Sequence, residues 1–197
     1  MKGYLESIQK MLPQYVYKIE GNVSNFTEES VGSSAKMDTI YVQASKIVEV
    51  LTFLRDHTNC LYKVLIDITA VDYPEKENRF EVVYLLLSVT TNSRLCVKIE
   101  VDELTSVPSV TPIYSAAGWL EREIWDLFGI FFSNHSDLRR ILTDYGFEGH
   151  PLRKDFPLTG YTEVRYDDTE KRVVSEPVEV SQEFRTFDFQ SPWIEGR

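Results

Sequence analysis

The first half of the chain contains stretches where hydrophobic residues recur at helical spacing and others where they follow strand patterns. Helical spacing predicts a short helix over residues 4–12 and a second one over residues 44–57. Short strand patterns occupy residues 15–20 and 39–42. Residues 21–34 are rich in Gly, Ser, Asn and acidic side chains, so we expect a loop there.

Three further strands are predicted in quick succession. Residues 61–71 are apolar and rich in β-branched side chains, and they end shortly before a proline. Residues 80–88 are almost continuously apolar, which is typical of an interior strand buried on both faces. Residues 94–101 alternate apolar and polar, which indicates a strand with one wet face. The polar turn at 90–93 predicts that the last two strands form an antiparallel hairpin.

The strongest amphipathic helix is predicted to begin with Pro112 in its first turn and to end at a Gly129 cap. Its apolar positions up to residue 128 fall on one face. We expect the solvent or partner side of this helix to carry Glu121, Arg122, Glu123 and Asp126. The spacing of Arg122 and Asp126 favours an ion pair along the helix.

Residues 144–193 have no sustained period of either kind, although they are heavy in Gly, Pro, charged and aromatic residues. So long a run without regular structure argues against simple core packing, and it is too aromatic for ordinary disorder. We therefore predict an α+β (α/β) fold, a small mixed β-sheet covered by helices, followed by a long extended C-terminal tail that lies on another protein. The predicted divisions are an N-terminal extension with a short helix at 1–35, an α/β domain at 36–142 and the tail at 143–197.

Composition narrows the classes of function. The 197 residues fit one domain with a tail, and the net charge of −10 argues against nucleic acid as a partner. The two cysteines, Cys60 and Cys96, lie in apolar runs and are too few for an iron–sulfur cluster or a structural zinc site. No run of about 18 apolar residues predicts a membrane span. Residues 1–14 resemble neither a secretory signal nor an Arg-rich transit peptide, so we expect the chain to work where it is made or to have lost a presequence.

The sequence gives only weak evidence for catalytic groups. The three histidines lack the close pairing of zinc enzymes, and we prefer structural roles for two of them, at a helix end for His57 and in pinning a turn for His135. Glu121 and Glu123 could form an acid and base pair, but two residues apart on a helix they point in different directions. Neither a phosphate-binding glycine loop nor a nucleophile elbow is present in the sequence.

The segment GHPLRKDFP at residues 149–157 is different, because two prolines stiffen a run of opposing charges. A solvated loop is the ordinary explanation for such a run. A stiffened segment presenting Arg and Asp also suits recognition of a partner surface.

These residues carry a family resemblance. The strings ERE at 121–123 and DLFG at 126–129, His135 seven residues after Phe128, and Arg139 with the following Ile-Leu pair are similar to the signature of the 30 kDa subunit family of respiratory complex I, the proton-pumping NADH:ubiquinone oxidoreductase. GHPLRKDFP resembles a second hallmark of that family. Further similar strings are FLRDH at 53–57, DYP at 72–74, RFEVVY at 79–84, EFR at 183–185 and SPW at 191–193, so the likeness covers roughly residues 38–193.

The resemblance implies a non-catalytic core scaffold subunit in the quinone-reducing module of the peripheral arm, which supports electron transfer from NADH to ubiquinone coupled to proton pumping. It implies an α/β domain whose C-terminal extension wraps the large quinone-module subunit, with neighbouring iron–sulfur subunits as further partners. No cofactor is expected in this chain, because iron–sulfur clusters, FMN and ubiquinone are held by partner subunits.

Under this resemblance the candidate site residues are interface or architectural groups and not catalysts. They are Glu121, Arg122, Glu123, His135, Arg139, His150, Arg153, Lys154, Asp155, Tyr161, Arg165, Tyr166, Phe184, Phe187, Phe189 and Trp193.

The long tail resembles versions encoded in the organelle genomes of plants and protists, which implies the matrix side of the mitochondrial inner membrane. The alternative is the cytoplasmic face of a bacterial plasma membrane. One rival function is the equivalent subunit of a related membrane-bound hydrogenase or of a plastid-type or bacterial dehydrogenase. A second rival is a free-standing enzyme using His135 or His150 with Asp155.

Overall fold

A computed structural model describes residues 2–20, 37–187 and 189, and the side chains from residue 7 onward within these ranges. The loop predicted at 21–34 and the candidate Trp193 lie outside the described residues. The chain divides into two compact units, residues 1–156 and residues 157–197. The first unit therefore continues past residue 142, where the sequence pattern had predicted the domain to end.

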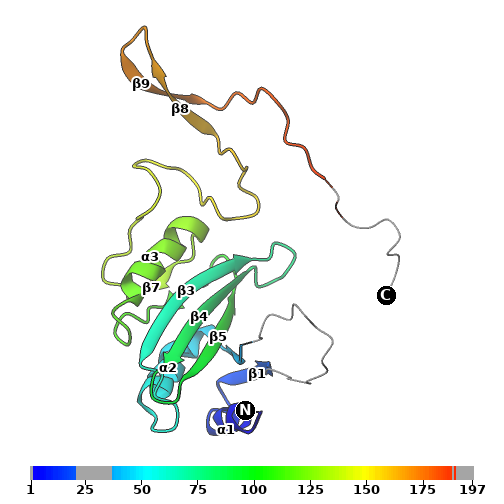
Figure 1. Cartoon of the computed structure of the whole chain (residues 1–197), viewed down its shortest axis with the longest axis vertical. Helices are drawn as coiled ribbons and strands as arrows, with labels where there is room; N and C mark the ends of the chain where they lie inside the picture. The colour runs from blue at the N-terminus through cyan, green and yellow to red at the C-terminus, as the bar shows by residue number, and fades with distance from the viewer. Residues whose placement is uncertain (1, 21–36, 188, 190–197) are drawn as a thin grey trace. The chain divides into compact units, whose positions relative to one another are not determined.

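The first unit contains a five-stranded mixed sheet and three α-helices (Figure 1). Its elements in chain order are α1 (Lys2–Met11), β1 (Val16–Glu20), β2 (Thr39–Val42), the 3-10 helix η1 (Ala44–Lys46), α2 (Ile47–Asp56), β3 (Val64–Asp72), β4 (Phe80–Ser88), β5 (Ser93–Val101), β6 (Val107–Pro108), α3 (Ala117–Phe128) and β7 (Phe132–Ser133). The strand order is β1-β2-β5-β4-β3, in which only β2 and β5 pair in parallel. The predicted α+β class and the β4–β5 hairpin are thus confirmed.

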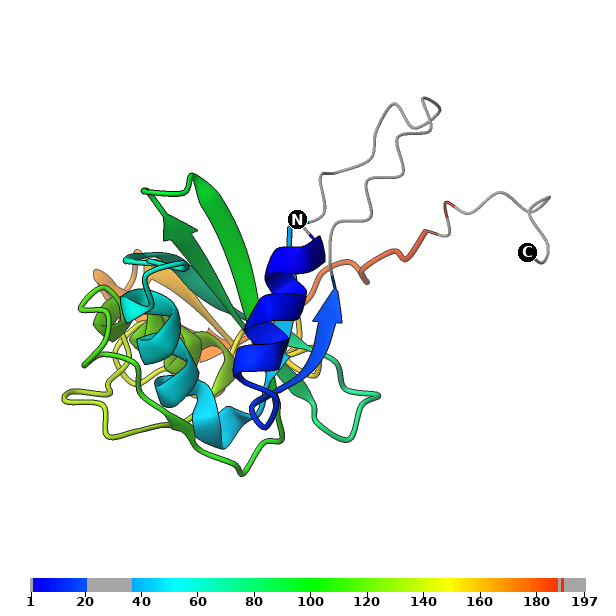
Figure 2. The ribbon, with the colours of Figure 1, turned by 90° about the horizontal axis from the view of Figure 1, so that it is seen from below.

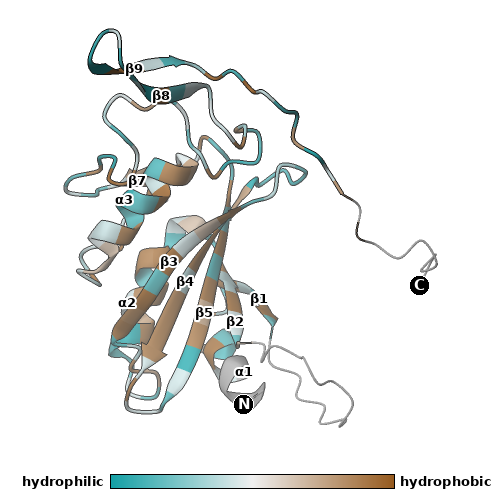
Figure 3. Ribbon diagram, turned by 45° about the horizontal axis from the view of Figure 1, so that its top comes forward, coloured by the Kyte–Doolittle hydropathy of each residue, from teal (hydrophilic) through white to brown (hydrophobic). Residues whose placement is uncertain are grey.

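One face of the sheet supplies the core. Alternate residues of β4 and β5 are fully buried on this face, and β4 is an interior strand as the sequence predicted. Helices α2 and α3 lie against this face (Figure 2), and Ile8 and Leu12 of the N-terminal segment join the same cluster. Large parts of strands β3, β4 and β5 are coloured as hydrophobic in Figure 3. The other face is more open, because Val64 and Ile66 of β3 remain exposed.

Two of the element starts that differ from the sequence predictions have a clear local cause. The helix predicted from Pro112 begins only at Ala117, because the preceding residues form turns in which Tyr114 donates its hydroxyl hydrogen to the carbonyl of Tyr62 at 2.6 Å. The strand predicted from residue 61 begins at Val64, because Leu61 has a positive φ of 50°. Gly129 ends α3 in the left-handed conformation at φ 76°, as predicted.

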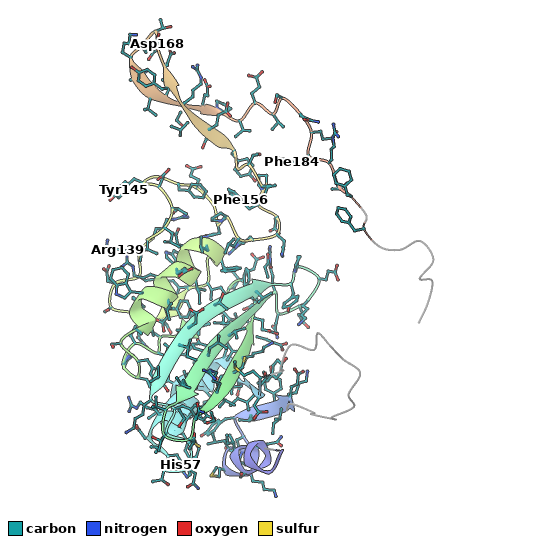
Figure 4. The ribbon with its side chains drawn as sticks, in the orientation of Figure 1. His57, Arg139, Tyr145, Phe156, Asp168 and Phe184 are labelled. Carbon is teal, nitrogen blue, oxygen red and sulfur yellow. The ribbon has the colours of Figure 1, made fainter. Side chains whose placement is uncertain are left out.

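The second unit contains a single hairpin among its described residues, formed by β8 (Thr162–Asp167) and β9 (Arg172–Pro177). The sequence analysis had predicted no regular structure here, and that prediction was wrong. Polar and apolar residues alternate over only the five residues 163–167 of β8, and the adjacent Val173 and Val174 break the alternation on β9. The chain after the hairpin is extended, and Figure 4 labels Asp168 at the hairpin turn and Phe184 on this extended part.

Candidate functional site

The polar side of α3 is buried, which corrects the prediction that it faces solvent or a partner. Glu121 and Asp126 are 0% exposed and Arg122 is 8% exposed, whereas Glu123 is exposed as predicted. The predicted ion pair between Arg122 and Asp126 is not among the contacts of the described residues. Segments on both sides of α3 in the sequence fold over this face, and each buried charge bonds to them instead.

Asp126 organises the segment that follows β7. Its Oδ2 accepts hydrogen bonds from the backbone N–H groups of Ile141 (3.1 Å), Leu142 (2.7 Å) and Thr143 (2.9 Å). Its Oδ1 accepts from the Thr143 hydroxyl at 2.7 Å and from Arg140 at 3.3 Å. Burial alone would raise the pKa of this carboxyl, but the hydrogen bonds outweigh it, so the pKa lies below its ordinary value. One carboxylate thus fixes the backbone of residues 141–143.

Arg122 holds the same segment from a second position. Its guanidinium donates to the carbonyl oxygens of Arg139 at 3.2 Å and Arg140 at 3.3 Å. It also lies 5.2 Å from the ring centroid of Trp119, which is exposed. Arg122 and Asp126 of α3 therefore hold residues 139–143 against the helix.

Glu121 binds the segment that precedes α3. Its carboxylate accepts hydrogen bonds from the Ser109 hydroxyl at 2.6 Å and the Val110 N–H at 2.7 Å. Burial raises the pKa of this group, while the two hydrogen bonds and nearby His135 oppose the rise. Glu121 therefore stabilises the fold, in agreement with the structural interpretation preferred over an acid and base pair with Glu123.

His135 pins a turn, one of the roles considered from the sequence. Its Nδ1 accepts the N–H of Asp137 at 3.0 Å, and its Nε2 lies 3.2 Å from the carbonyl oxygen of Gly118. Because Nδ1 acts as an acceptor, the ring proton is on Nε2, which donates it to the carbonyl oxygen of Gly118. Both ring nitrogens are thus used within the first unit.

His150 holds the start of GHPLRKDFP against the end of α3. Its Nδ1 donates to the carbonyl of Asp126 at 2.9 Å, and its ring lies edge-on to Trp125. Burial lowers its pKa, and the charges of Arg153 and Arg140 lower it further. A Cβ at Gly129 would lie 2.6 Å from the His150 ring, so the close approach requires glycine there.

A charge network fastens residues 153–155 to the sheet. Arg79 donates to Asp72 at 2.7 and 2.9 Å, to Asp155 at 2.5 Å and to Glu103 at 2.5 Å. Asp72 also accepts the backbone N–H of Lys154 at 2.8 Å. These bonds hold the pKa of Asp72 below its ordinary value and that of Arg79 above it, in each case chiefly through the Asp72–Arg79 pair.

Arg153 completes this network, which we call the Arg79 network (Asp72, Arg79, Glu103, Arg153 and Asp155). It donates to the carbonyl of Phe128 at 2.6 Å, and its guanidinium lies 5.2 Å from the ring centroid of Phe80. Sequence reasoning named Arg153 and Asp155 but did not assign a role to Asp72, Arg79 or Glu103. The available signal was the pair of charges that bracket the β3–β4 turn at Asp72 and Arg79.

The remaining candidates of the first unit lie at its surface. Arg139 is exposed and pairs with Asp137 at 2.8 Å, and Figure 4 shows it with Tyr145 on the segment beside α3. The side chain of Lys154 is exposed. The structure therefore separates the signature residues into buried groups that bind the chain itself and exposed groups that are open to a partner.

The histidines do not form one catalytic group with Asp155. His135 contacts α3 at Gly118 and His150 contacts it at Asp126, about 12 Å apart along the helix axis. His57 lies at the end of α2, as predicted, and stacks on Phe53. Asp155 pairs with Arg79. Among the described residues Asp155 is a hydrogen-bond partner of neither histidine, so the pairing that the free-standing enzyme hypothesis requires, His135 or His150 with Asp155, is not formed.

The candidates of the second unit are largely exposed. Tyr161, Arg165, Tyr166, Phe184, Phe187 and Phe189 are all on its surface. Arg165 pairs with Glu176 across the hairpin, and the rings of Phe187 and Phe189 lie 6.0 Å apart. These aromatic side chains offer apolar area that the described part of this unit leaves uncovered.

Neither a metal-binding cluster nor a membrane-spanning helix occurs among the described residues. Within residues 2–20, 37–187 and 189, no group of three or more His, Cys, Asp or Glu side chains could hold a metal ion. Both cysteines are buried, and neither forms a disulfide. None of the helices in this part of the chain has the length and apolar character needed to cross a bilayer.

Comparisons with known proteins give one consistent family. Residues 40–162 match the family described as respiratory-chain NADH dehydrogenase, 30 Kd subunit. The chain is 55% identical over 193 residues to NADH-ubiquinone oxidoreductase subunit 9 of Reclinomonas americana, covering 98% of this chain and 89% of that protein. It is 60% identical over 191 residues to the protein of the same name from Prototheca wickerhamii, covering 97% and 93%.

Bacterial and archaeal similarities extend this result. A subunit of the NADH-quinone oxidoreductase of Paramagnetospirillum magneticum is 62% identical over 155 residues, covering 79% of this chain and 78% of that protein. A chain in the structure of the membrane-bound sulfane sulfur reductase, an archaeal respiratory membrane complex, aligns with a TM-score of 0.62 and 26% identity. That alignment covers 80% of this chain and 85% of the other.

Proposed function

The chain belongs to the 30 kDa subunit family of the respiratory-chain NADH dehydrogenase, and from this premise we propose that it acts as a scaffold. It is a peripheral-arm subunit of NADH:ubiquinone oxidoreductase, respiratory complex I, and is not catalytic by itself. Its role is to position neighbouring subunits so that their redox groups lie within electron-transfer distance.

The observation that carries the scaffold role is the contrast between buried charges and exposed aromatics. The charged signature residues on α3 bond within the first unit, so they set its shape. The aromatic side chains of the second unit are exposed in this chain, which is the character expected of residues that anchor an interface.

The finer assignments follow from the same proposal. The chain belongs to the quinone-reducing module, and its principal partner is the large subunit of that module, with iron–sulfur subunits as further neighbours. Iron–sulfur clusters, FMN and ubiquinone are held by partner subunits. The complex lies at a membrane, and the proposed site is the matrix side of the mitochondrial inner membrane.

A rival is the equivalent subunit of a membrane complex with a different electron donor. The archaeal sulfane sulfur reductase complex contains a chain of similar fold at 26% identity. Identities of 55–62% to subunits of NADH oxidoreductases favour the complex I assignment over this rival.

The test is where the full-length chain migrates. Membranes are solubilised gently and resolved on a native gel, which is stained for NADH oxidation and probed for this chain. Migration in a large NADH-oxidising assembly is the expected result. Migration in a large assembly without the stain would favour the rival, and a band at the mass of the free chain would contradict the scaffold role.

A further inference from the structure

The hairpin of the second unit has two chemically different faces. Opposed residues of antiparallel strands project to the same side of a sheet. The register therefore places Val164 and Tyr166 on one face with Val173, which lies opposite Tyr166. The same register places Arg165, Val174 and Glu176 on the other face.

The first of these faces is apolar and exposed. Val164, Tyr166 and Val173 are 64%, 59% and 61% exposed, and we call them the apolar hairpin face. On the opposite side, Arg165 and Glu176 bind each other. The charged side thus forms an ion pair within the hairpin, whereas the apolar hairpin face has no cover within the described part of its unit.

An uncovered apolar face is unfavourable for a hairpin of only two strands. A two-stranded hairpin alone in water is marginally stable, and it needs packing against another surface to persist. Burial of three such side chains would supply that stabilisation. The hairpin is therefore suited to dock by this face.

Charge indicates the chemistry of the surface that it meets. The described residues of the second unit carry seven Asp or Glu against four Lys or Arg. Three of these four bases are paired with acids inside the hairpin. Glu179 and Glu183, which follow β9 and are exposed, form none of these pairs. A complementary surface would present Lys or Arg beside an apolar strip.

We propose that the apolar hairpin face docks on a neighbouring protein subunit, against an apolar strip bordered by lysine or arginine side chains near Glu179 and Glu183. This inference rests on the proposed function and adds which face of the tail makes the contact and what chemistry the partner presents. The charged face stays in contact with water.

The decisive experiment compares two triple variants of the full chain, expressed in cells that lack the wild-type copy. One carries Val164→Thr, Tyr166→Thr and Val173→Thr on the apolar face. The other carries Glu163→Thr, Arg172→Thr and Val174→Thr, three positions that the register places on the charged face, and keeps the Arg165–Glu176 pair. Threonine suits strands, so both hairpins can still form. We expect the first to lose incorporation into the NADH-oxidising assembly by about ten-fold or more and the second to incorporate nearly as wild type.

Site-specific photo-cross-linking then identifies the occupant. A benzophenone side chain replaces Tyr166 in one chain and Val174 in another. We expect cross-linking to another subunit only from position 166, on a peptide with apolar and basic residues. Cross-links to lipid, to a second copy of this chain or to an acidic peptide would overturn the proposal.

The possible failures are distinguishable. Absence of the wild-type chain from the assembly would show that the proposed function is wrong, and this inference would fall with it. Presence of wild type together with normal incorporation of the apolar-face variant would overturn this inference alone. Equal losses from both triple variants would also overturn it, because the two faces would then not differ.

Discussion

The two units of this chain handle their side chains in opposite ways. The first unit buries charged residues, including Glu121, Asp126 and Asp72, and gives each a partner inside the chain. The second unit exposes residues that are ordinarily buried, among them Tyr166 and Phe187. Buried charges without partners and exposed aromatic clusters are both unfavourable in isolation. The first unit therefore has what it needs to fold by itself, and the second leaves apolar side chains exposed, as the proposed scaffold role requires.

Removal of the second unit is the strongest way to test this contrast. A chain ending at Phe156 retains the whole hydrophobic core cluster, so it should still unfold cooperatively on heating. Incorporation into the assembly should fall to background, since the exposed aromatic side chains are gone. Circular dichroism and the native gel measure the two outcomes. A truncated chain that assembles normally would contradict the scaffold role of the tail.

Loss of Arg79 should damage the first unit most severely among single substitutions. In Arg79→Ala the fully buried carboxylate of Asp72 loses its bidentate partner and Asp155 loses its ion pair, while Glu103 keeps only Arg153 at 3.6 Å. We expect the free energy of unfolding in urea to fall by about 3 kcal/mol. The matched control is Arg139→Ala, an exposed arginine paired with exposed Asp137, which should change it by less than about 0.5 kcal/mol. Equal effects would contradict the network's role.

Phe187→Ser probes the second unit in the complementary way. The exposed ring contributes little to the fold of the free chain, so thermal unfolding should be unchanged. Incorporation should weaken by about ten-fold, more than for any single surface charge, because aromatic anchors dominate interface energetics. Trp193 is predicted to act in the same way. Quantitative native gels compare Phe187→Ser with Lys171→Ser as the control, and equal losses would count against aromatic anchoring.

The smallest expected effect is a pH dependence at His150. Its folded-state pKa lies below the ordinary value of 6.5, so the unfolded chain binds more protons between these two values. Its contribution to stability is therefore fully present above pH 6.5 and is lost as the pH falls through the folded-state pKa. Unfolding in urea from pH 7.5 to 5 should show this loss in the wild type and a shallower slope in His150→Asn. An identical slope in the variant would rule out this origin.

The order of elements in the first unit could be predicted from local pattern. Strands β4 and β5 and helix α2 follow from the spacing of apolar residues, and the αL cap at Gly129 follows from its place after the last apolar turn. The family resemblance rested on short strings of residues, which can be recognised in the sequence without knowing their positions in the fold. These features depend on neighbours a few residues apart.

The orientation of α3 could not be predicted in the same way. Its polar residues form a regular polar face. The periodicity of the sequence shows which face of a helix is polar, but it does not show whether that face contacts water or the backbone of another segment. Asp126 is buried because the N–H groups of residues 141–143 come to it from outside the helix. The same limit hid the Arg79 network, whose members Arg79 and Asp155 are 76 residues apart in the sequence and meet only in the folded chain.

The sequence by itself therefore determined the three helices and five sheet strands of the first unit, the fold class and the family, because each follows from local spacing and short motifs. Tertiary structure alone decided which charges are internal and which side chains are left for a partner. The physical reason is that burial of a charge depends on donors supplied by distant segments. The register of the β8–β9 hairpin, and with it the separation of an apolar face from a charged one, is likewise a property of two strands together.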